Sequence, residues 1–166
     1  MDCDVRLLIV FILAWANVPI AAYGRDTRSI EQVSAIMSPI PFGSITSEQL
    51  RKLRIEGDLP CIHWTDCSYY AHGPVAHSVY DGKIVGKWLK VVAGEQIAAF
   101  GIGFARLQAA VLPKVEARIG KPLNCSRPSA IAEMECLAEI GEGSLSLQFD
   151  QSGKLSSVYL QNWTAP

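Results

Sequence analysis

The sequence predicts an α+β fold made of tandem α-β-β-β repeats, with helices packed on one face of an antiparallel meander sheet or sheets. Three observations predict it. The same ordered landmarks occur twice along the chain: Phe-Gly, a helix-like segment, Gly, Pro, Cys and a second Cys. Helical periodicity marks the segment after the second Phe-Gly. Alternating apolar and polar runs, separated by Gly-containing turns, follow each pair of cysteines and indicate half-buried strands.

Composition limits the class of protein. The chain has 166 residues, is 49% hydrophobic and 19% charged, and has a formal net charge of −1. This is the composition of one ordinary globular domain or two very small ones. The near-zero charge offers no basic footprint for nucleic acid, and no composition typical of disorder, collagen or a coiled coil is present.

The first 24 residues are predicted to be a signal peptide. The apolar run Leu7–Trp15 is too short for a bilayer span, which needs roughly 20 residues, and the small residues Ala21 and Ala22 follow it. An uncleaved anchor or a buried strand is the alternative. Cys3 precedes the run, so no lipid-anchor cysteine lies at the cleavage site. We therefore expect a periplasmic or secreted protein without a membrane anchor, and residues 25–41 form its N-terminal segment.

Four cysteines remain after cleavage, namely Cys61, Cys67, Cys125 and Cys136. An even number in an exported chain indicates disulfides, and four cysteines allow three connectivities. The repeated landmarks favour Cys61–Cys67 and Cys125–Cys136. A zinc site at Cys61, His63 and Cys67 is the competing interpretation, and its spacing fits structural zinc poorly.

The first repeat is predicted to span residues 42–92. Thr46 and Gln49 have the spacing of a capping box, and a short helix is expected over Ser47–Ile55. A three-strand meander should follow, and Asp81-Gly82 is a hairpin signal because both central residues of that turn need positive φ. The strands are expected at 68–70, 76–80 and 83–92.

A linker at 93–99 joins the second repeat, residues 100–166. A helix is expected over Phe104–Ile119 from its apolar stripe, with a kink or a break at Pro113 and a stop at Gly120. Strands should follow at 132–140, 144–149 and 155–160, and the last two should be joined by a turn at Asp150–Gly153.

Several of these residues form motifs that resemble those of known protein families. Phe100-Gly101, the helix with Val111 and Val115, and the stop Ile119-Gly120-Lys121-Pro122 resemble small bacterial envelope proteins of the β-barrel assembly lipoprotein type. The closing hairpin, which includes Phe149-Asp150 and Gly153-Lys154-Leu155, is similar to theirs. Two such units in tandem, each with a disulfide, resemble the β-lactamase inhibitor protein architecture. The resemblance implies an exported binding module whose concave sheet holds a partner protein.

The functional prediction is a non-enzymatic protein-binding protein without a cofactor, such as an inhibitor or an immunity protein. Aromatic side chains are typical anchors of protein interfaces, and a disulfide-closed loop would present a ring with little entropy loss. The predicted partner-binding residues are His63, Trp64, Tyr69, Tyr70 and Trp88. The alternatives are an envelope-assembly scaffold component and, in another class, a small metal-dependent hydrolase.

The hydrolase alternative would use His63, His72 and His77. A turn at Gly73-Pro74 separates the last two histidines. The carboxylates of Glu133 and Glu135 alternate along an expected strand, so a solvated sheet face accounts for them without catalysis.

Overall fold

The computed structural model describes residues 28–46, 48–49, 54–55, 68–127 and 133–164, and for Tyr69, Tyr70 and His72 it describes the backbone. The predicted signal peptide, the Cys61–Cys67 bridge, His63 and Trp64 lie outside these residues. The elements in chain order are α1 (Ile30–Met37), β1 (Gly43–Ser44), β2 (Arg54–Ile55), β3 (Ser68–His72), β4 (Val75–Tyr80), β5 (Lys83–Lys90), the 3₁₀ turn η1 (Ala99–Gly101), α3 (Gln108–Ile119), β6 (Asn124–Ser126), β7 (Met134–Ile140), β8 (Gly143–Phe149) and β9 (Leu155–Asn162).

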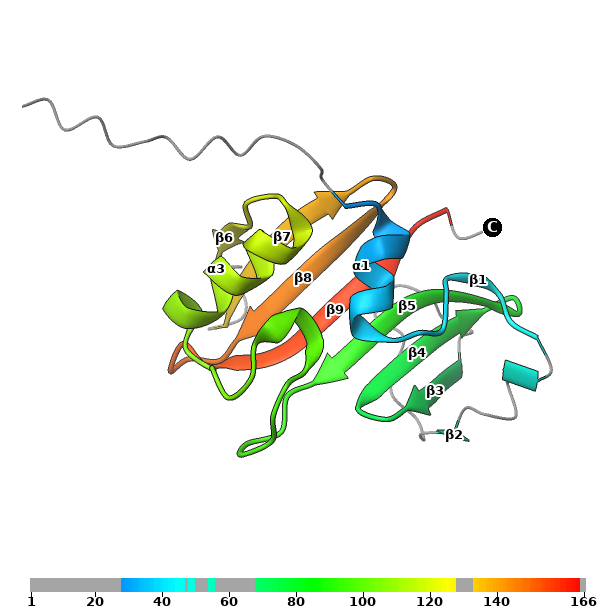
Figure 1. The fold of residues 1–166 in the computed structure, drawn as a ribbon, viewed down its shortest axis with the longest axis horizontal. Helices are drawn as coiled ribbons and strands as arrows, with labels where there is room; N and C mark the ends of the chain where they lie inside the picture. The colour runs from blue at the N-terminus through cyan, green and yellow to red at the C-terminus, as the bar shows by residue number, and fades with distance from the viewer. Residues whose placement is uncertain (1–27, 47, 50–53, 56–67, 128–132, 165–166) are drawn as a thin grey trace, which may run out of the picture.

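The protein is α+β, as predicted, and its described residues form nine strands of one antiparallel sheet. The strand order is β2-β3-β4-β5-β9-β8-β7-β6, and β1 pairs with β5. Two meanders, β3-β4-β5 and β7-β8-β9, therefore meet through their last strands, and Trp88 of β5 lies opposite Tyr159 of β9. Figure 1 shows α1 and α3 in front of the same face of the sheet.

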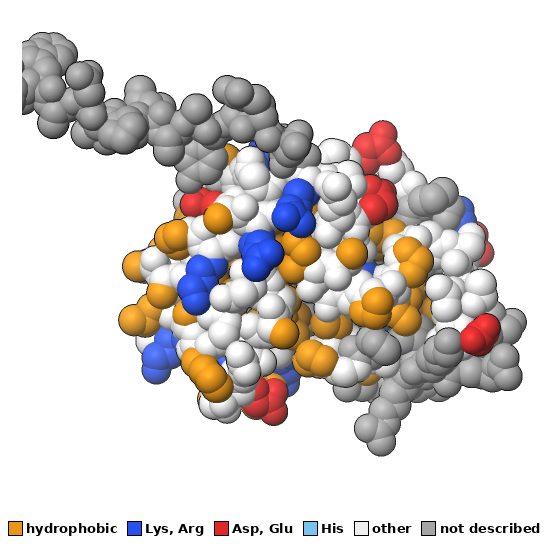
Figure 2. All heavy atoms as spheres, viewed as in Figure 1, with side chains coloured by type: hydrophobic (Ala, Val, Ile, Leu, Met, Phe, Trp, Pro, Cys, Tyr) orange, Lys and Arg blue, Asp and Glu red, His pale blue; other side chains and the backbone are white. Residues whose placement is uncertain are grey.

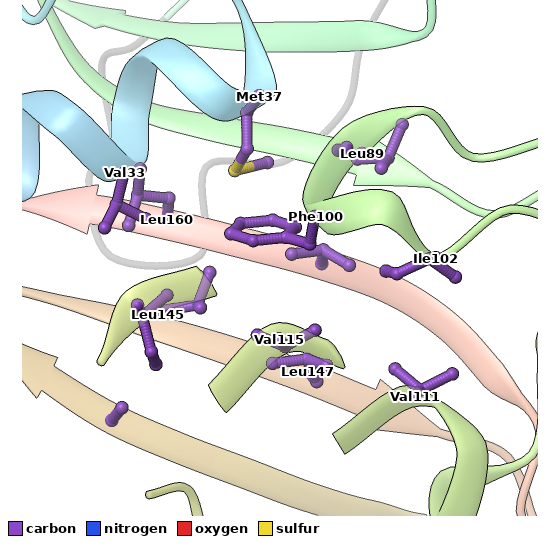
Figure 3. Packing of buried hydrophobic residues seen from close by; sticks show 14 of the residues in the cluster. Val33, Met37, Leu89, Phe100, Ile102, Val111, Val115, Leu145, Leu147 and Leu160 are labelled. Atoms are coloured by element: carbon purple, nitrogen blue, oxygen red, sulfur yellow. The ribbon is translucent and has the colours of Figure 1, made fainter. Parts of the chain in front are cut away.

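The core lies between these helices and the sheet. Val33 and Met37 of α1, and Val111, Val115 and Ile119 of α3, contribute the helical side of the core. The sheet side includes Leu145, Leu147, Val158 and Leu160, and Phe100 of η1 fills the space between the helices (Figure 3). Alternate residues of each strand face this core, so the remaining residues face away from the helices.

Local sequence signals account for most of the strands. Asp81 and Gly82 have φ of 48° and 68°, which confirms the predicted turn between β4 and β5. Asp150 closes the β8–β9 turn, because its Oδ1 accepts hydrogen bonds from the backbone N–H of Ser152 and of Lys154 at 2.8 and 2.9 Å. The predicted capping box is also present, since Thr46 and Gln49 exchange side-chain hydrogen bonds of 2.7 and 3.1 Å.

The helix predictions need three corrections. The helix expected over Ser47–Ile55 does not reach Ile55, because Arg54–Ile55 form β2 and pair with β3. The helix expected from Phe104 begins at Gln108, because Gly103 and Leu107 are held in isolated backbone bridges to Ile97 and Lys154.

The third correction concerns Pro113, where a kink or a break was expected: the break does not occur, and α3 continues through the proline. Removing one backbone donor is tolerated there because Val111 and Val115 anchor this helix from either side of the proline.

Helix α1 was not expected. It begins at a capping box in which Ser29 accepts from the Gln32 backbone and the Gln32 side chain accepts from the Ser29 backbone. This Ser-x-x-Gln signal is readable in the sequence, and the buried residues Ile30, Val33 and Met37 supply the helical periodicity.

The predicted Cys125–Cys136 disulfide is present. It joins directly opposed residues of β6 and β7, and the Gln108 side chain at the start of α3 lies over its sulfurs. Among the described residues, no helix combines the length and hydrophobicity that a membrane crossing requires.

Replacing both of these cysteines by alanine is expected to lower the free energy of unfolding by about 2–3 kcal/mol, because the bridge closes a short loop in the unfolded chain. The measurement is denaturant unfolding of the double variant beside the parent protein. Substitution is preferable to a reductant, which would also act on Cys61 and Cys67. An unchanged unfolding midpoint would contradict the expectation.

Candidate functional site

Trp88 is the predicted site residue whose side chain the structure places in a defined pocket. It lies on β5 opposite Ala76 of β4, and its neighbour Leu89 belongs to the core. Because side chains alternate along a strand, the half-buried Trp88 faces away from the helices.

The Trp88 pocket has a volume of about 320 Å³. Its apolar lining comes from Trp88, Ala76, Pro74 and the exposed Val92, and Lys90 and Glu95 add one charge of each sign. The β3–β4 turn, the end of β5 and the segment after it therefore build a small apolar recess with both charges beside it. Such a recess fits one apolar side chain of a partner protein.

Tyr159 adds a second aromatic residue beside Trp88. The two residues are paired across β5 and β9, and both are half-buried. A Cβ at Gly86 would lie 2.8 Å from the Tyr159 hydroxyl oxygen and 3.0 Å from Ser78 Oγ. Glycine at position 86 therefore lets the phenol lie over β5, close to Trp88.

A second pocket lies on the helix side of the same β3–β4 turn. Its volume is about 310 Å³, and its lining includes Met37 of α1, Val75, Leu89 and Ile97. It shares Gly73, Pro74, Lys90, Val92 and Glu95 with the Trp88 pocket. The turn thus separates two hollows on opposite faces of the sheet.

Lys87, directly before Trp88, faces the helices and is fully buried. Its Nζ donates to the backbone carbonyls of Ser34 and Ser38, at the C-terminal end of α1, at 3.0 and 2.8 Å. It also lies 5.5 Å from the centroid of the Phe42 ring. The Ser34 carbonyl also accepts from the Ser38 backbone N–H at 3.1 Å, so Lys87 adds a second donor there, and a cation at this end of a helix is favoured by the helix dipole.

Burial lowers the pKa of Lys87 to about 7, because desolvation disfavours the charged amine. His77, the residue opposite Lys87 on β4, is also fully buried, and its Nε2 shares a hydrogen bond of 2.9 Å with Ser38 Oγ. An amine and an imidazole of this kind can act as acid and base, but Lys87 has no exposed surface that a substrate could reach. In this conformation the cluster anchors α1 to the sheet.

For the remaining predicted site residues on β3, the structure gives the backbone positions. Tyr69 and Tyr70 lie in β3 and pair through the backbone with Ser78 and His77. His72 ends β3 opposite Val75. His77 of the proposed histidine set is committed to Ser38, and among the described residues no group of three potential metal ligands is found.

The carboxylates considered for hydrolysis also receive a structural explanation. Glu135 of β7 accepts a hydrogen bond of 2.6 Å from Ser146 Oγ on β8, on the face away from the helices. Glu133 directly precedes β7. Glu135 is half-buried and Ser146 is buried, so a hydrogen bond between the two strands, and not a solvated face, accounts for Glu135.

Sequence reasoning missed Pro74, Glu95 and Tyr159 as neighbours of Trp88. Gly73-Pro74 is visible as a turn signal. The pairing of β5 with β9 brings together Trp88 and Tyr159, which are 71 positions apart, and the sequence carries no local signal for it.

Comparison with known proteins identifies no family. No protein-family model matches the sequence, and no curated protein matches it significantly. Among solved structures, the chain is similar to the DUF4309 family protein YjgB from Bacillus subtilis subsp. subtilis str. 168, with a TM-score of 0.47 and 13% sequence identity. The match covers 81% of this chain and 97% of that chain. Likeness at this level supports no conclusion about fold or function.

Proposed function

We propose that the protein is an exported, non-enzymatic binding protein that holds a partner protein at the Trp88 pocket. The observation that carries the proposal is the half-buried Trp88 lining a recess of about 320 Å³ on the face of the sheet opposite α1 and α3. One apolar side chain of the partner would enter the recess, and Lys90 and Glu95 would meet polar groups around it. Binding energy at protein interfaces concentrates at such aromatic anchors.

Rigidity of the strand below the pocket supports this function. Lys87 and Leu89, on either side of Trp88, are buried under the helices. The hydrogen bonds from Lys87 to α1 hold β5 from its other face. A side chain fixed before binding loses little entropy when the partner arrives, so more of the contact energy appears as affinity.

Other parts of the proposal rest on the sequence. Export rests on the apolar run Leu7–Trp15, and a second anchor at His63 and Trp64 rests on the Cys61–Cys67 loop. Tyr69 and Tyr70, on the neighbouring strand β3, would extend the contact area. An inhibitor or an immunity protein is the most concrete form of such a module. A tandem α-β-β-β origin is supported by the two three-strand meanders, each of which has a positive-φ glycine, Gly82 or Gly153, in the turn before its last strand.

Replacing Trp88 by alanine is expected to weaken partner binding by at least about 1–2 kcal/mol, which is roughly 5- to 30-fold in Kd. The partner would be identified by affinity capture from the envelope fraction, purified, and titrated by calorimetry against each variant. Trp163→Ala is the matched control, because Trp163 is exposed and lies outside the pocket lining. Equal affinities for the parent protein and Trp88→Ala would refute the pocket as the site.

A further inference from the structure

A second surface, on the helix side of the molecule, has a different chemistry from the Trp88 pocket. Phe104 and Leu107 lie in the segment between η1 and α3 and are 69% and 57% exposed. They are the two most exposed large hydrophobic side chains of the described residues. Large apolar side chains in solvent are unfavourable by roughly 25 cal/mol per Å², and contiguous exposed apolar surface commonly marks an interaction site.

The segment that carries these side chains is tied down on both sides. Ile97 and Gly103 exchange two backbone hydrogen bonds of 2.8 Å. At the other end, the Leu155 N–H donates to the Arg106 carbonyl at 2.7 Å. The backbone that carries Phe104 and Leu107 is therefore held in place, with both side chains exposed.

Arg106, which lies between the two apolar residues, strengthens this arrangement. Its guanidinium donates to the carbonyls of Gly103 and Ala105 at 3.2 and 2.9 Å, and also to the carbonyl of Glu95. The arginine thereby ties the segment after β5 to the segment before α3. These hydrogen bonds stabilise the backbone conformation that holds the two apolar side chains outward.

Basic residues lie on the elements next to this segment. Lys114 Nζ donates to the Ile102 carbonyl at 3.1 Å, and the Arg118 guanidinium lies 3.8 Å from the position that a Cβ of Gly101 would take. Lys154 is the backbone partner of Leu107. We call Phe104, Leu107, Lys114, Arg118 and Lys154 the amphiphilic patch.

The charge of this region differs from that of the whole chain. Residues 100–127 contain five Lys or Arg and one acidic residue, Glu116, although the net charge of the chain is −1. Glu116 turns toward the backbone, where its Oε1 accepts from the Leu123 N–H at 2.9 Å. Asp150, an acidic neighbour of Lys154, is bonded within its own turn. Figure 2 shows Lys and Arg side chains over α3, bordered by hydrophobic ones.

We propose that the amphiphilic patch adsorbs to the surface of an anionic lipid bilayer. Phe104 and Leu107 enter the headgroup region, and Lys114, Arg118 and Lys154 lie against the negatively charged lipid headgroups. Protruding apolar side chains with cations on the neighbouring elements match a membrane interface, whereas the recess at Trp88 suits a side chain of a protein. This is reversible adsorption of the folded domain and needs no anchor.

The test is cosedimentation of the full chain with vesicles of phosphatidylcholine alone or mixed with phosphatidylglycerol. We expect binding to the anionic vesicles, weakened when sodium chloride rises from about 0.1 to 0.5 M, because salt shortens the range of the attraction. Equal binding to both vesicle types, or to neither, would overturn the proposal.

Two double variants separate the apolar and ionic contributions. Lys114→Glu with Arg118→Glu should weaken binding to anionic vesicles at least about 30-fold, at roughly fivefold for each cation lost. Phe104→Ser with Leu107→Ser should weaken it at least about tenfold. The serine pair replaces exposed side chains, so it keeps the test decisive if the charge-reversed pair fails to fold.

Matched controls show whether position matters. Trp163→Ser removes another exposed apolar side chain, and Lys83→Glu with Lys90→Glu reverses two cations on β5. Binding that falls as much in these controls as in the patch variants would overturn the assignment. Binding that survives both patch variants would place the membrane contact elsewhere in the chain, for example at Leu7–Trp15.

Discussion

The free energy of unfolding of the parent protein is expected to increase relative to that of Lys87→Met as the pH rises above 7. Burial lowers the pKa of Lys87 from its ordinary value of 10.5 to about 7 in the folded protein. Between these values the unfolded chain binds a proton that the folded protein does not, so stability rises with pH. The slope is about 1.4 kcal/mol per pH unit.

Over the whole pH range between the two pKa values of Lys87, the free energy of unfolding changes by at most about 5 kcal/mol, because a shift of one pKa unit corresponds to about 1.4 kcal/mol. Below pH 7 both states hold the proton and this contribution no longer changes. The neutral amine still has two N–H donors, which match the two carbonyls of Ser34 and Ser38. The α1 anchor therefore survives deprotonation.

Urea unfolding of both proteins at pH 7.5, 8.5 and 9.5 measures this difference and cancels ionisations that the two proteins share. Lys90→Met is the matched control, because Lys90 is exposed at the end of the same strand. If the difference in unfolding free energy between the parent and Lys87→Met stays constant over these pH values, the Lys87 amine is not desolvated in solution.

Replacing Gly143 by alanine is expected to destabilise the fold by about 3 kcal/mol or more, at or beyond the upper end of ordinary overpacking. A Cβ at this position would lie 2.1 Å from the carbonyl oxygen of Gln161 and 2.9 Å from Ile30 Cδ1. The Ile30 methyl group can move aside. The Gln161 carbonyl belongs to β9, so it cannot withdraw without disturbing the pairing of β8 with β9.

The control is Gly141→Ala, two residues earlier in the same hairpin. Gly141 has a φ of 57° and open space around it, so alanine there introduces backbone strain of roughly 1–2 kcal/mol without a collision. Thermal or urea unfolding of both variants measures the difference. A Gly143→Ala protein as stable as Gly141→Ala would contradict the close approach of Gly143 to β9.

Local patterns predicted the elements that local chemistry controls. The Asp81-Gly82 turn, the Thr46 capping box and the strands that became β4, β8 and β9 were read from adjacent residues, because turn geometry and alternation depend on neighbours in the chain. The start of α3 was misplaced because Leu107 and Gly103 form backbone bridges to distant residues. Pairing with a distant partner overrides helical periodicity.

The candidate site was predictable to a smaller extent. Trp88 was identified as a binding residue from its type and its place in a strand, and the structure places it in a pocket. Glu95 and Tyr159 join it through loop packing and the β5–β9 register. The sequence does not single out Lys87, because its partners are backbone carbonyls of a helix about 50 residues away.

By itself, the sequence determined the α+β class and the two meanders, which follow from periodicity and turn residues. Its repeated landmarks favoured the Cys125–Cys136 pairing among three possible connectivities, and the structure contains that bridge. The tertiary structure decided that the meanders join through β5 and β9, that Lys87 lies under α1, and that Phe104 and Leu107 remain in solvent. The physical reason is the separation along the chain of the groups that interact. Backbone geometry responds to neighbouring residues, whereas strand register, burial and desolvation depend on groups that only the folded chain brings together.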